Sequence, residues 1–399
     1  SGSNDVGTLS MTFYWNVEEH GSDGYDILYF SDMPNESLGL IPWYEAVKAD
    51  GTVLPYYITS AYNSVEASDG TPRSQPGKSP MGIKSYDQWR QAYQEKGFGY
   101  NGGGMSANTL QIIFLIVKYL TKNSQTVFTG CSGYNYQYKS VTSENNVKRV
   151  ILDETEANRI PVGGCVSIGN PSSNNLDRNN DEVHSLANRV RVIKKETVTI
   201  GSTRYIAITV DSPNTFSTTT NTVVSCMPMY TGMTDSVIGS YDGSPVNNKN
   251  NTYPYRIKGI EYGIGMNYIA SDLMLVYQPD YSAKIYFAAK GVQHTYKDYE
   301  TNYEEVGTLP APATKNKQNV WIGDVKFDVK RGLCYPITYT GTSGNDGTGD
   351  RYEAAGAATS GYRTYTIGGR LGNWEACGAT FTYTWASQWH EDWNQCSRD

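Results

Sequence analysis

The chain has 399 residues, a net charge of −7, 40 glycines and 33 tyrosines. A chain of this length can bury a core without staples, and its composition excludes a coiled coil, a helical repeat and an acidic disordered tail. The longest basic run is Lys194-Lys195, which argues against nucleic acid and anionic membranes as partners. The longest apolar run, residues 112–117, is too short to cross a bilayer, so no membrane insertion is predicted.

Residues 1–38 are predicted to form an extended arm. The amino end is polar and lacks the apolar core of a signal peptide. Alternating polar and apolar side chains from Thr8 to Trp15 predict a strand. A second strand is predicted from Tyr25 to Phe30, paired with the first across a turn at residues 21–24.

Two helices are predicted next along the chain. Ser85 and Gln88 have the spacing of a capping box, in which each end group satisfies a free backbone amide. A second helix is predicted to begin near Ser106 and to run to about Leu120. Its apolar residues lie on nearly every side, which is typical of a helix buried in the centre of a domain.

After residue 125 the pattern changes to short β-branched segments. Residues 189–200 and 203–210 predict a hairpin across Gly201-Ser202. Residues 340–361 are rich in Gly, Thr, Ser and Ala and predict a long loop. The fold class predicted from these segments is α+β: two early helices followed by antiparallel strands. Further strands are predicted at residues 258–276, 282–290 and 321–329.

Neither an enzyme activity nor a cofactor or metal site is predicted. The six cysteines include no C-x-x-C pair, and no nucleophile motif is present. An acidic cluster at residues 177–182 has part of the oxygen spacing of a calcium loop, and a second at residues 345–353 could also gather a hard cation. The first lacks the turn glycine and the final glutamate, and we interpret both clusters as solvated acids. Free thiols are favoured, with pairing of Cys377 and Cys396 left open.

Residues 368–399 differ from the rest of the chain because they hold four of its eight tryptophans. Polar side chains interleave with these rings, and such a mixture gives rigid contact area and adaptable hydrogen bonds. Alternation along Phe381, Tyr383 and Trp385 predicts that one face of this segment packs inward. The predicted ligand contacts are Leu371, Asn373, Trp374, Glu375, Thr382, Tyr383, Trp385, Ser387, Trp389, His390, Asp392, Trp393 and Asn394.

Four stretches, taken in order, resemble the variable proteins of diversity-generating retroelements. The first is Pro42-Trp43-Tyr44 with the following residues to 62, and the second is the two-helix segment to residue 125. The third lies at residues 243–272, and the last runs from Gly368-Gly369-Arg370 to Cys396-Ser397-Arg398. Leu371 stands where the family often has Trp, and Cys396 where Gly is usual. The resemblance covers residue 39 to the terminus.

This resemblance implies a C-type lectin-like domain of the formylglycine-generating-enzyme type over residues 39–399. A β-rich insertion is expected at 171–250 and a variable region at 368–399. The implied function is receptor binding or adhesion to a protein or glycan on a cell surface, by a phage virion or extracellular protein. Oligomerisation is left open. The alternatives are a formylglycine-generating-type oxidoreductase, and a structural virion or adhesin subunit.

In that family, mutation of template adenines scatters Asn codons. Trp, Glu and Gln cannot arise from Asn codons in this way. The positions that the resemblance implies to be fixed are Trp374, Glu375, Trp385, Gln388, Trp389 and Trp393. The positions implied to be diversified are Asn373, Thr382, Tyr383, Ser387, His390, Asp392 and Asn394.

Overall fold

The fold is β-rich. The computed structural model describes residues 4–20, 24–97, 100, 102–236, 248, 250–289, 297, 299–312, 319–340, 344, 347–354 and 361–398. Of the residues described, 41% lie in strands and 13% in helices, and a nearly closed sheet dominates. The predicted α+β, C-type lectin-like fold built on two helices is therefore wrong. The prediction gave too much importance to the two helices. It missed the extent of the sheets, because strands distant in sequence pair in ways that local patterns do not reveal.

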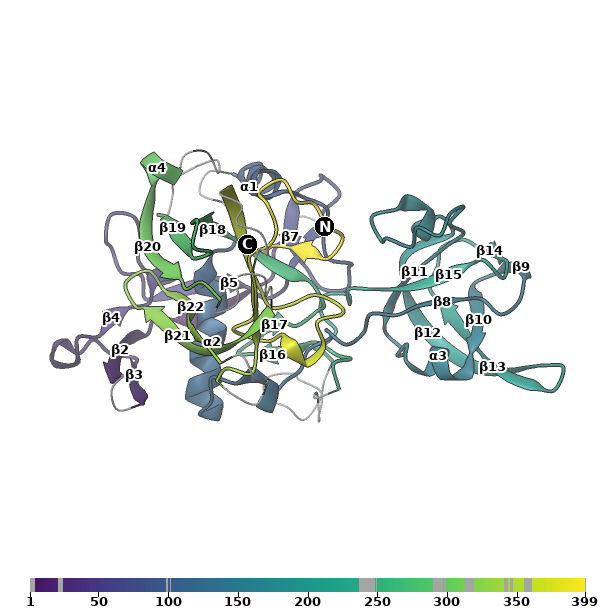
Figure 1. Cartoon of the computed structure of the whole chain (residues 1–399), viewed down its shortest axis with the longest axis horizontal. Helices are drawn as coiled ribbons and strands as arrows, with labels where there is room; N and C mark the ends of the chain where they lie inside the picture. Colours follow the sequence, from purple (N-terminus) through teal and green to yellow (C-terminus); the bar gives the residue numbers. More distant parts are fainter. Residues whose placement is uncertain are drawn as a thin grey trace.

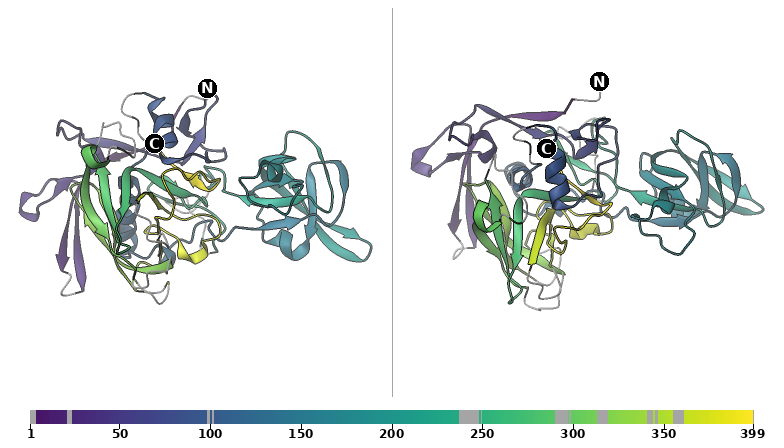
Figure 2. Two further views of the ribbon diagram at one scale, coloured as in Figure 1. Left: turned by 45° about the horizontal axis from the view of Figure 1, so that its top comes forward. Right: turned by 90° about the horizontal axis from the view of Figure 1, so that it is seen from above.

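The molecule has two lobes joined by two chain segments (Figure 1). We call residues 137–227 the small lobe and the remaining described residues the body. The views in Figure 2 show the same separation, with both chain ends on the body. Because the small lobe is one continuous stretch of chain, it interrupts the body between two of its segments.

A nine-stranded sheet forms the frame of the body. Tyr335 Oη, near one edge, donates a hydrogen bond to the Val306 carbonyl at the other edge, at 3.4 Å, so the sheet almost closes on itself. Its strands are β18 (Asn267–Tyr277), β19 (Ala283–Ala288), β20 (Tyr303–Leu309), β21 (Asn319–Asp328), β22 (Leu333–Tyr339), β23 (Arg351–Glu353), β24 (Gly361–Ile367), β25 (Thr382–Tyr383) and β26 (Gln395–Cys396). Their order is β20-β19-β18-β24-β25-β23-β21-β22, with β26 parallel to β18.

The two predicted helices are present in the body. Helix α1 (Tyr86–Gln94) begins with the expected capping box, in which Gln88 Oε1 accepts from the Ser85 amide at 2.7 Å. Helix α2 (Met105–Tyr119) buries Leu110, Ile113 and their neighbours on nearly all sides, as its apolar composition predicts. Helix α4 (Tyr299–Asn302) is a single short turn.

The amino-terminal residues form two separate pairings. Trp15 of β2 (Tyr14–His20) faces Phe30 of β3 (Tyr25–Ser31), so only the last two residues of the first predicted strand have the expected partner. The chain breaks its strand at Thr12-Phe13, and β1 (Gly7–Met11) pairs instead with β5 (Tyr56–Ser60). Turn residues 21–23 lie outside the described residues. The other short strands of the body are β4 (Ile41–Pro42), β6 (Ser64–Glu66), β7 (Pro72–Ser74), β16 (Tyr255–Ile257) and β17 (Ile260–Tyr262).

The small lobe is built on a six-stranded sheet. The predicted hairpin is confirmed, since Ile200 pairs with Thr203 across its turn. The lobe starts well before residue 171, where the insertion was predicted. Its elements are β8 (Gln137–Lys139), β9 (Glu144–Val147), β10 (Arg149–Asp153), α3 (Glu154–Asn158), β11 (Cys165–Gly169), β12 (Ala187–Ile200), β13 (Thr203–Val210), β14 (Phe216–Thr218) and β15 (Val223–Met227). The sheet order is β10-β13-β12-β11-β15-β8, with β9 paired to β14.

The predicted long loop at residues 340–361 contains a strand. Residues Arg351–Glu353 form β23, which is antiparallel to β21 and parallel to β25. A three-residue strand between glycine-rich stretches gives no periodic signal, because alternation needs at least four residues to be read. This strand carries two charged side chains into the site described next.

Candidate ligand-binding site

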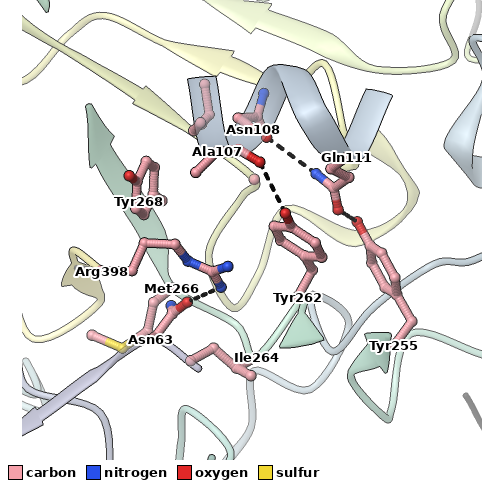
Figure 3. Close-up of a pocket in the computed structure, with 13 residues that line it drawn as sticks. Asn63, Ala107, Asn108, Gln111, Tyr255, Tyr262, Ile264, Met266, Tyr268 and Arg398 are labelled. Atoms are coloured by element: carbon pink, nitrogen blue, oxygen red, sulfur yellow. Dashed lines mark hydrogen bonds between the residues drawn. The ribbon is translucent and has the colours of Figure 1, made fainter. Parts of the chain in front are cut away.

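The carboxy-terminal segment is anchored in the core of the body. The Arg398 guanidinium is buried and donates through Nη2 to Asn63 Oδ1 at 2.6 Å and to the Glu261 carbonyl at 2.7 Å. It also lies 4.6 Å from the centre of the Tyr262 ring (Figure 3). The Ser397 carbonyl accepts from the Ser64 amide at 2.9 Å. These bonds give the preceding loops a fixed base.

A cavity of about 30 Å³ lies beside Arg398 and helix α2. Figure 3 shows hydrogen bonds within its polar lining: Tyr255 donates to Gln111, and Tyr262 to the Ala107 carbonyl at 2.9 Å. A cavity of this size holds about one water molecule. It is part of the packing around the anchor and is too small for a ligand.

Six of the predicted contacts are buried, and only Tyr383 among them lines the cleft described below. Thr382 and Tyr383 form β25 inside the sheet, and the Tyr383 side chain is only 3% exposed. Leu371 and Trp393 pack into the hydrophobic cluster shared with the small lobe. The ring of Trp393 lies under the Arg178 guanidinium at 4.6 Å. Asp392 and Asn394 complete the buried set.

The other predicted contacts reach the surface. Trp374, Trp385 and Trp389 are 50%, 54% and 59% exposed, which is unusual for large apolar rings. Asn373, Ser387 and His390 are partly exposed. The side chain of Glu375 lies outside the described residues. The prediction thus mixed two kinds of side chain, because Trp and Tyr serve equally as core and as contact residues.

Trp374 and Trp385 line one cleft of about 520 Å³, which we call the tryptophan cleft. Cavities of 300–1,000 Å³ are the usual size of ligand sites. Trp389 lies outside it. The cleft is lined by Asn319, Trp321, Arg351, Glu353, Ala354, Arg370, Gly372, Asn373, Trp374, Ala376, Tyr383 and Trp385. Strands β21, β23 and β25 supply part of its lining, while Trp374 comes from a short helical turn and Trp385 from the segment after β25.

The backbone of Trp374 has the left-handed conformation, with φ of +54°. A bulky residue in this region costs about 1–2 kcal/mol relative to ordinary backbone geometry. Neighbouring groups hold it there: Ser132 Oγ donates to the Trp374 carbonyl at 2.7 Å, and the Tyr136 ring contacts the indole edge-on at 6.3 Å. The fold therefore stabilises a strained residue whose ring is half exposed, and strain of this kind gathers at functional sites.

Charged groups surround the rings of the tryptophan cleft. The Arg370 guanidinium lies over Tyr383 at 5.4 Å, and the Arg351 guanidinium over Trp321 at 5.4 Å. Glu353 lies between them, with Oε1 3.8 Å from Arg351 Nη1. Burial raises the pKa of Glu353, while the two arginines act to lower it. From the sequence, Arg370 was noted only as part of the Gly-Gly-Arg motif and was not predicted as a ligand contact.

Gly369 explains how Arg370 reaches the cleft. Its φ is +92°, and a Cβ atom there would collide with the Cys377 side chain. Only glycine fits this position. Trp321, Arg351 and Glu353 were not predicted as ligand contacts, because the pairing of β21 with β23 brings them together from distant parts of the chain. Glu353 had been noted only as part of an acidic cluster, and Trp321 only as part of a strand.

The predicted acidic clusters and cysteines are mainly structural. Glu182 accepts from Ser172 Oγ at 2.8 Å, while Asn345 and Asp346 lie outside the described residues. Among the described residues, no group of three His, Cys, Asp or Glu side chains could hold a metal ion. All six cysteines are buried and free. Burial raises the pKa of Cys377, which disfavours the reactive thiolate.

Comparison with known proteins gives no family for the chain: no model of a protein family matches it, and neither does any curated protein. Among the described helices, none has the length and apolar character needed to cross a membrane. The resemblance to retroelement variable proteins therefore stays a prediction.

Proposed function

We propose that the protein binds an external ligand in the tryptophan cleft and acts as a receptor-binding or adhesin-type protein. The observation that carries this proposal is the strained, half-exposed Trp374, which faces the same cleft as Trp385. An indole ring held in such a position loses little conformational freedom when a ligand covers it. Tryptophan and arginine are also the residues that most often dominate binding energy.

The proposed site has a different centre from the site that was expected from the sequence. It consists of the exposed rings at residues 374 and 385 with the charged side chains of β23 and Arg370, and of the six buried contacts it includes only Tyr383. We propose that the ligand belongs to a cell surface and that the chain works on a virion or outside the cell. This part of the proposal is supported by the resemblance alone.

Binding of the labelled full chain to a panel of bacterial cells, arrayed glycans and arrayed surface proteins would test the proposal. We expect Trp374→Ala and Trp385→Ala to reduce binding at least tenfold. Trp389→Ala is the matched control, because it removes an equally exposed indole from outside the cleft. Equal losses in all three variants would contradict a role for the cleft, as would full binding by a folded double variant.

We further propose that the carboxy-terminal segment is diversified by a retroelement. Burial now restricts the positions that can vary: Asn373, Ser387 and His390 reach the surface, whereas Thr382 and Asn394 are packed inside. Comparison of the gene with a neighbouring template repeat should show differences at template adenines, concentrated in the three surface codons. Differences spread over all bases would reject diversification by a retroelement, but they would not bear on the proposal that the cleft binds a ligand.

A further inference from the structure

We infer that the ligand of the tryptophan cleft is a saccharide that carries a carboxylate. This inference rests on the proposed function and narrows it from any protein or glycan to one chemical class. It depends on three observations: the exposed rings, the excess of cationic over anionic side chains, and the scarcity of aliphatic lining.

The rings of Trp374 and Trp385 suit the flat face of a sugar. An indole face carries partial negative charge, and the C–H groups on one face of a pyranose carry partial positive charge. Stacking therefore pairs complementary surfaces and leaves the sugar hydroxyls at the edge. Asn373 and Glu353 stand at this edge, where the Asn373 amide donates to Glu353 Oε1 at 3.0 Å and orients it as an acceptor. Hydroxyl groups need donors and acceptors of this kind.

The charged side chains of the cleft favour an anionic ligand. It contains two guanidinium groups, Arg351 and Arg370, and one described carboxylate, Glu353. No carboxylate of a described residue forms an ion pair with Arg370, whereas Arg351 has Glu353 at 3.8 Å. A guanidinium stacked on a ring is held in one plane and keeps its N–H edge for a planar, bidentate partner such as a carboxylate. The cleft is thus locally cationic in a chain of net charge −7.

The lining argues against an apolar protein side chain as the main anchor. Among the described residues that line the cleft, the only aliphatic side chains are those of Ala354 and Ala376, both buried. A Leu or Phe anchor from a partner protein would meet arginine, glutamate and amide groups and would leave them without partners. A polyhydroxylated acid satisfies these groups while it covers the indoles.

The test uses an array in which each acidic oligosaccharide, ending in a uronic or sialic acid, has a methyl-ester counterpart and a sulfated counterpart. The strongest member is then titrated into the full chain by calorimetry. We expect acidic members to bind at least tenfold more tightly than their esters. Arg370→Gln should remove this preference, so that acid and ester bind with similar affinities. The matched control is Arg204→Gln, which replaces an exposed arginine of the small lobe and should leave the affinities for acid and ester as they are in the wild type.

Each other outcome overturns part of the proposal. Equal binding of acid and ester, or binding of the sulfated member alone, rejects the carboxylate. Binding to surface proteins through Trp374 and Trp385, with no saccharide bound, rejects the saccharide and leaves the proposed function standing. Failure of the cleft variants to change any binding rejects the proposed function itself. Thermal melting of each variant shows whether it is folded.

Discussion

Trp374 is the residue at which stability and function are expected to conflict. Its backbone occupies a region that favours glycine, and its indole covers little of the core because half of it is exposed. A residue selected for stability alone would be glycine or asparagine here. The presence of tryptophan is therefore more easily explained by what its ring contacts outside the molecule.

We expect Trp374→Gly to be more stable than Trp374→Ala by about 1 kcal/mol, because both remove the ring and only glycine relieves the backbone strain. Both variants should lose ligand binding. Urea unfolding of the two variants gives the difference in free energy. If alanine proved as stable as glycine, the backbone at this position would carry no strain.

Asp350 should make the protein less stable as the pH rises. Complete burial raises its pKa from 3.8 to about 6, although its bonds to Thr380 and Gln125 act to lower it. Between about pH 4 and 6 the folded protein therefore holds a proton that the unfolded chain releases, so the free energy of unfolding falls as the pH rises through this range and stays lower above it.

We expect Asp350→Asn to reduce the loss of stability between pH 4 and pH 7 by about 1–3 kcal/mol. Unfolding by urea at the two pH values, for the wild type and the variant, measures this change. Other buried acids contribute to both proteins equally, so only the difference between the two slopes is informative. Identical slopes would show that Asp350 has an ordinary pKa in the folded state.

At the scale of elements, α2 carries more of the stability than the surface loops do. Leu110→Ala should cost about 2–5 kcal/mol, since it removes a fully buried side chain from a packed core. Leu120→Ala removes the same atoms from a site that is 88% exposed and should change the free energy of unfolding by less than about 0.5 kcal/mol. Chemical denaturation compares them. Similar losses would mean that α2 is not the centre of the body.

The elements that could be predicted from the sequence are those specified by neighbouring residues. Helix α1 has its capping box, α2 its apolar faces, and the small-lobe hairpin its Gly-Ser turn. The sheet of the body could not be predicted, because β25 pairs with β23 in a parallel register and β18 receives β26 from the far end of the chain. The tryptophan cleft depends on these pairings, so only Asn373, Trp374, Tyr383 and Trp385 of its lining were expected.

At the scale of the whole molecule, two lobes with largely separate cores should unfold in separate steps. The small lobe has its own hydrophobic cluster, to which the body contributes side chains such as Leu371 and Trp393. The Trp393 amide also donates to Asn179 Oδ1 at 3.0 Å. These contacts couple the lobes without merging their cores, and multidomain proteins of this kind depart from two-state behaviour.

We expect differential scanning calorimetry to resolve two transitions. Val166→Ala, in the core of the small lobe, should lower the midpoint of one transition, and Leu110→Ala should lower the other. A single transition shifted by both variants would show that the lobes unfold as one unit.

The anchoring of Arg398 and β26 also bears on how the protein is made. All strands of the small-lobe sheet are adjacent in the chain, so they can pair while synthesis continues. Strand β18, by contrast, gains its parallel neighbour only after Gln395 has left the ribosome. A nascent chain would thus carry a finished small lobe on an unfinished body, and premature termination shortly before Gln395 would remove β26, the parallel neighbour of β18, together with the buried Arg398.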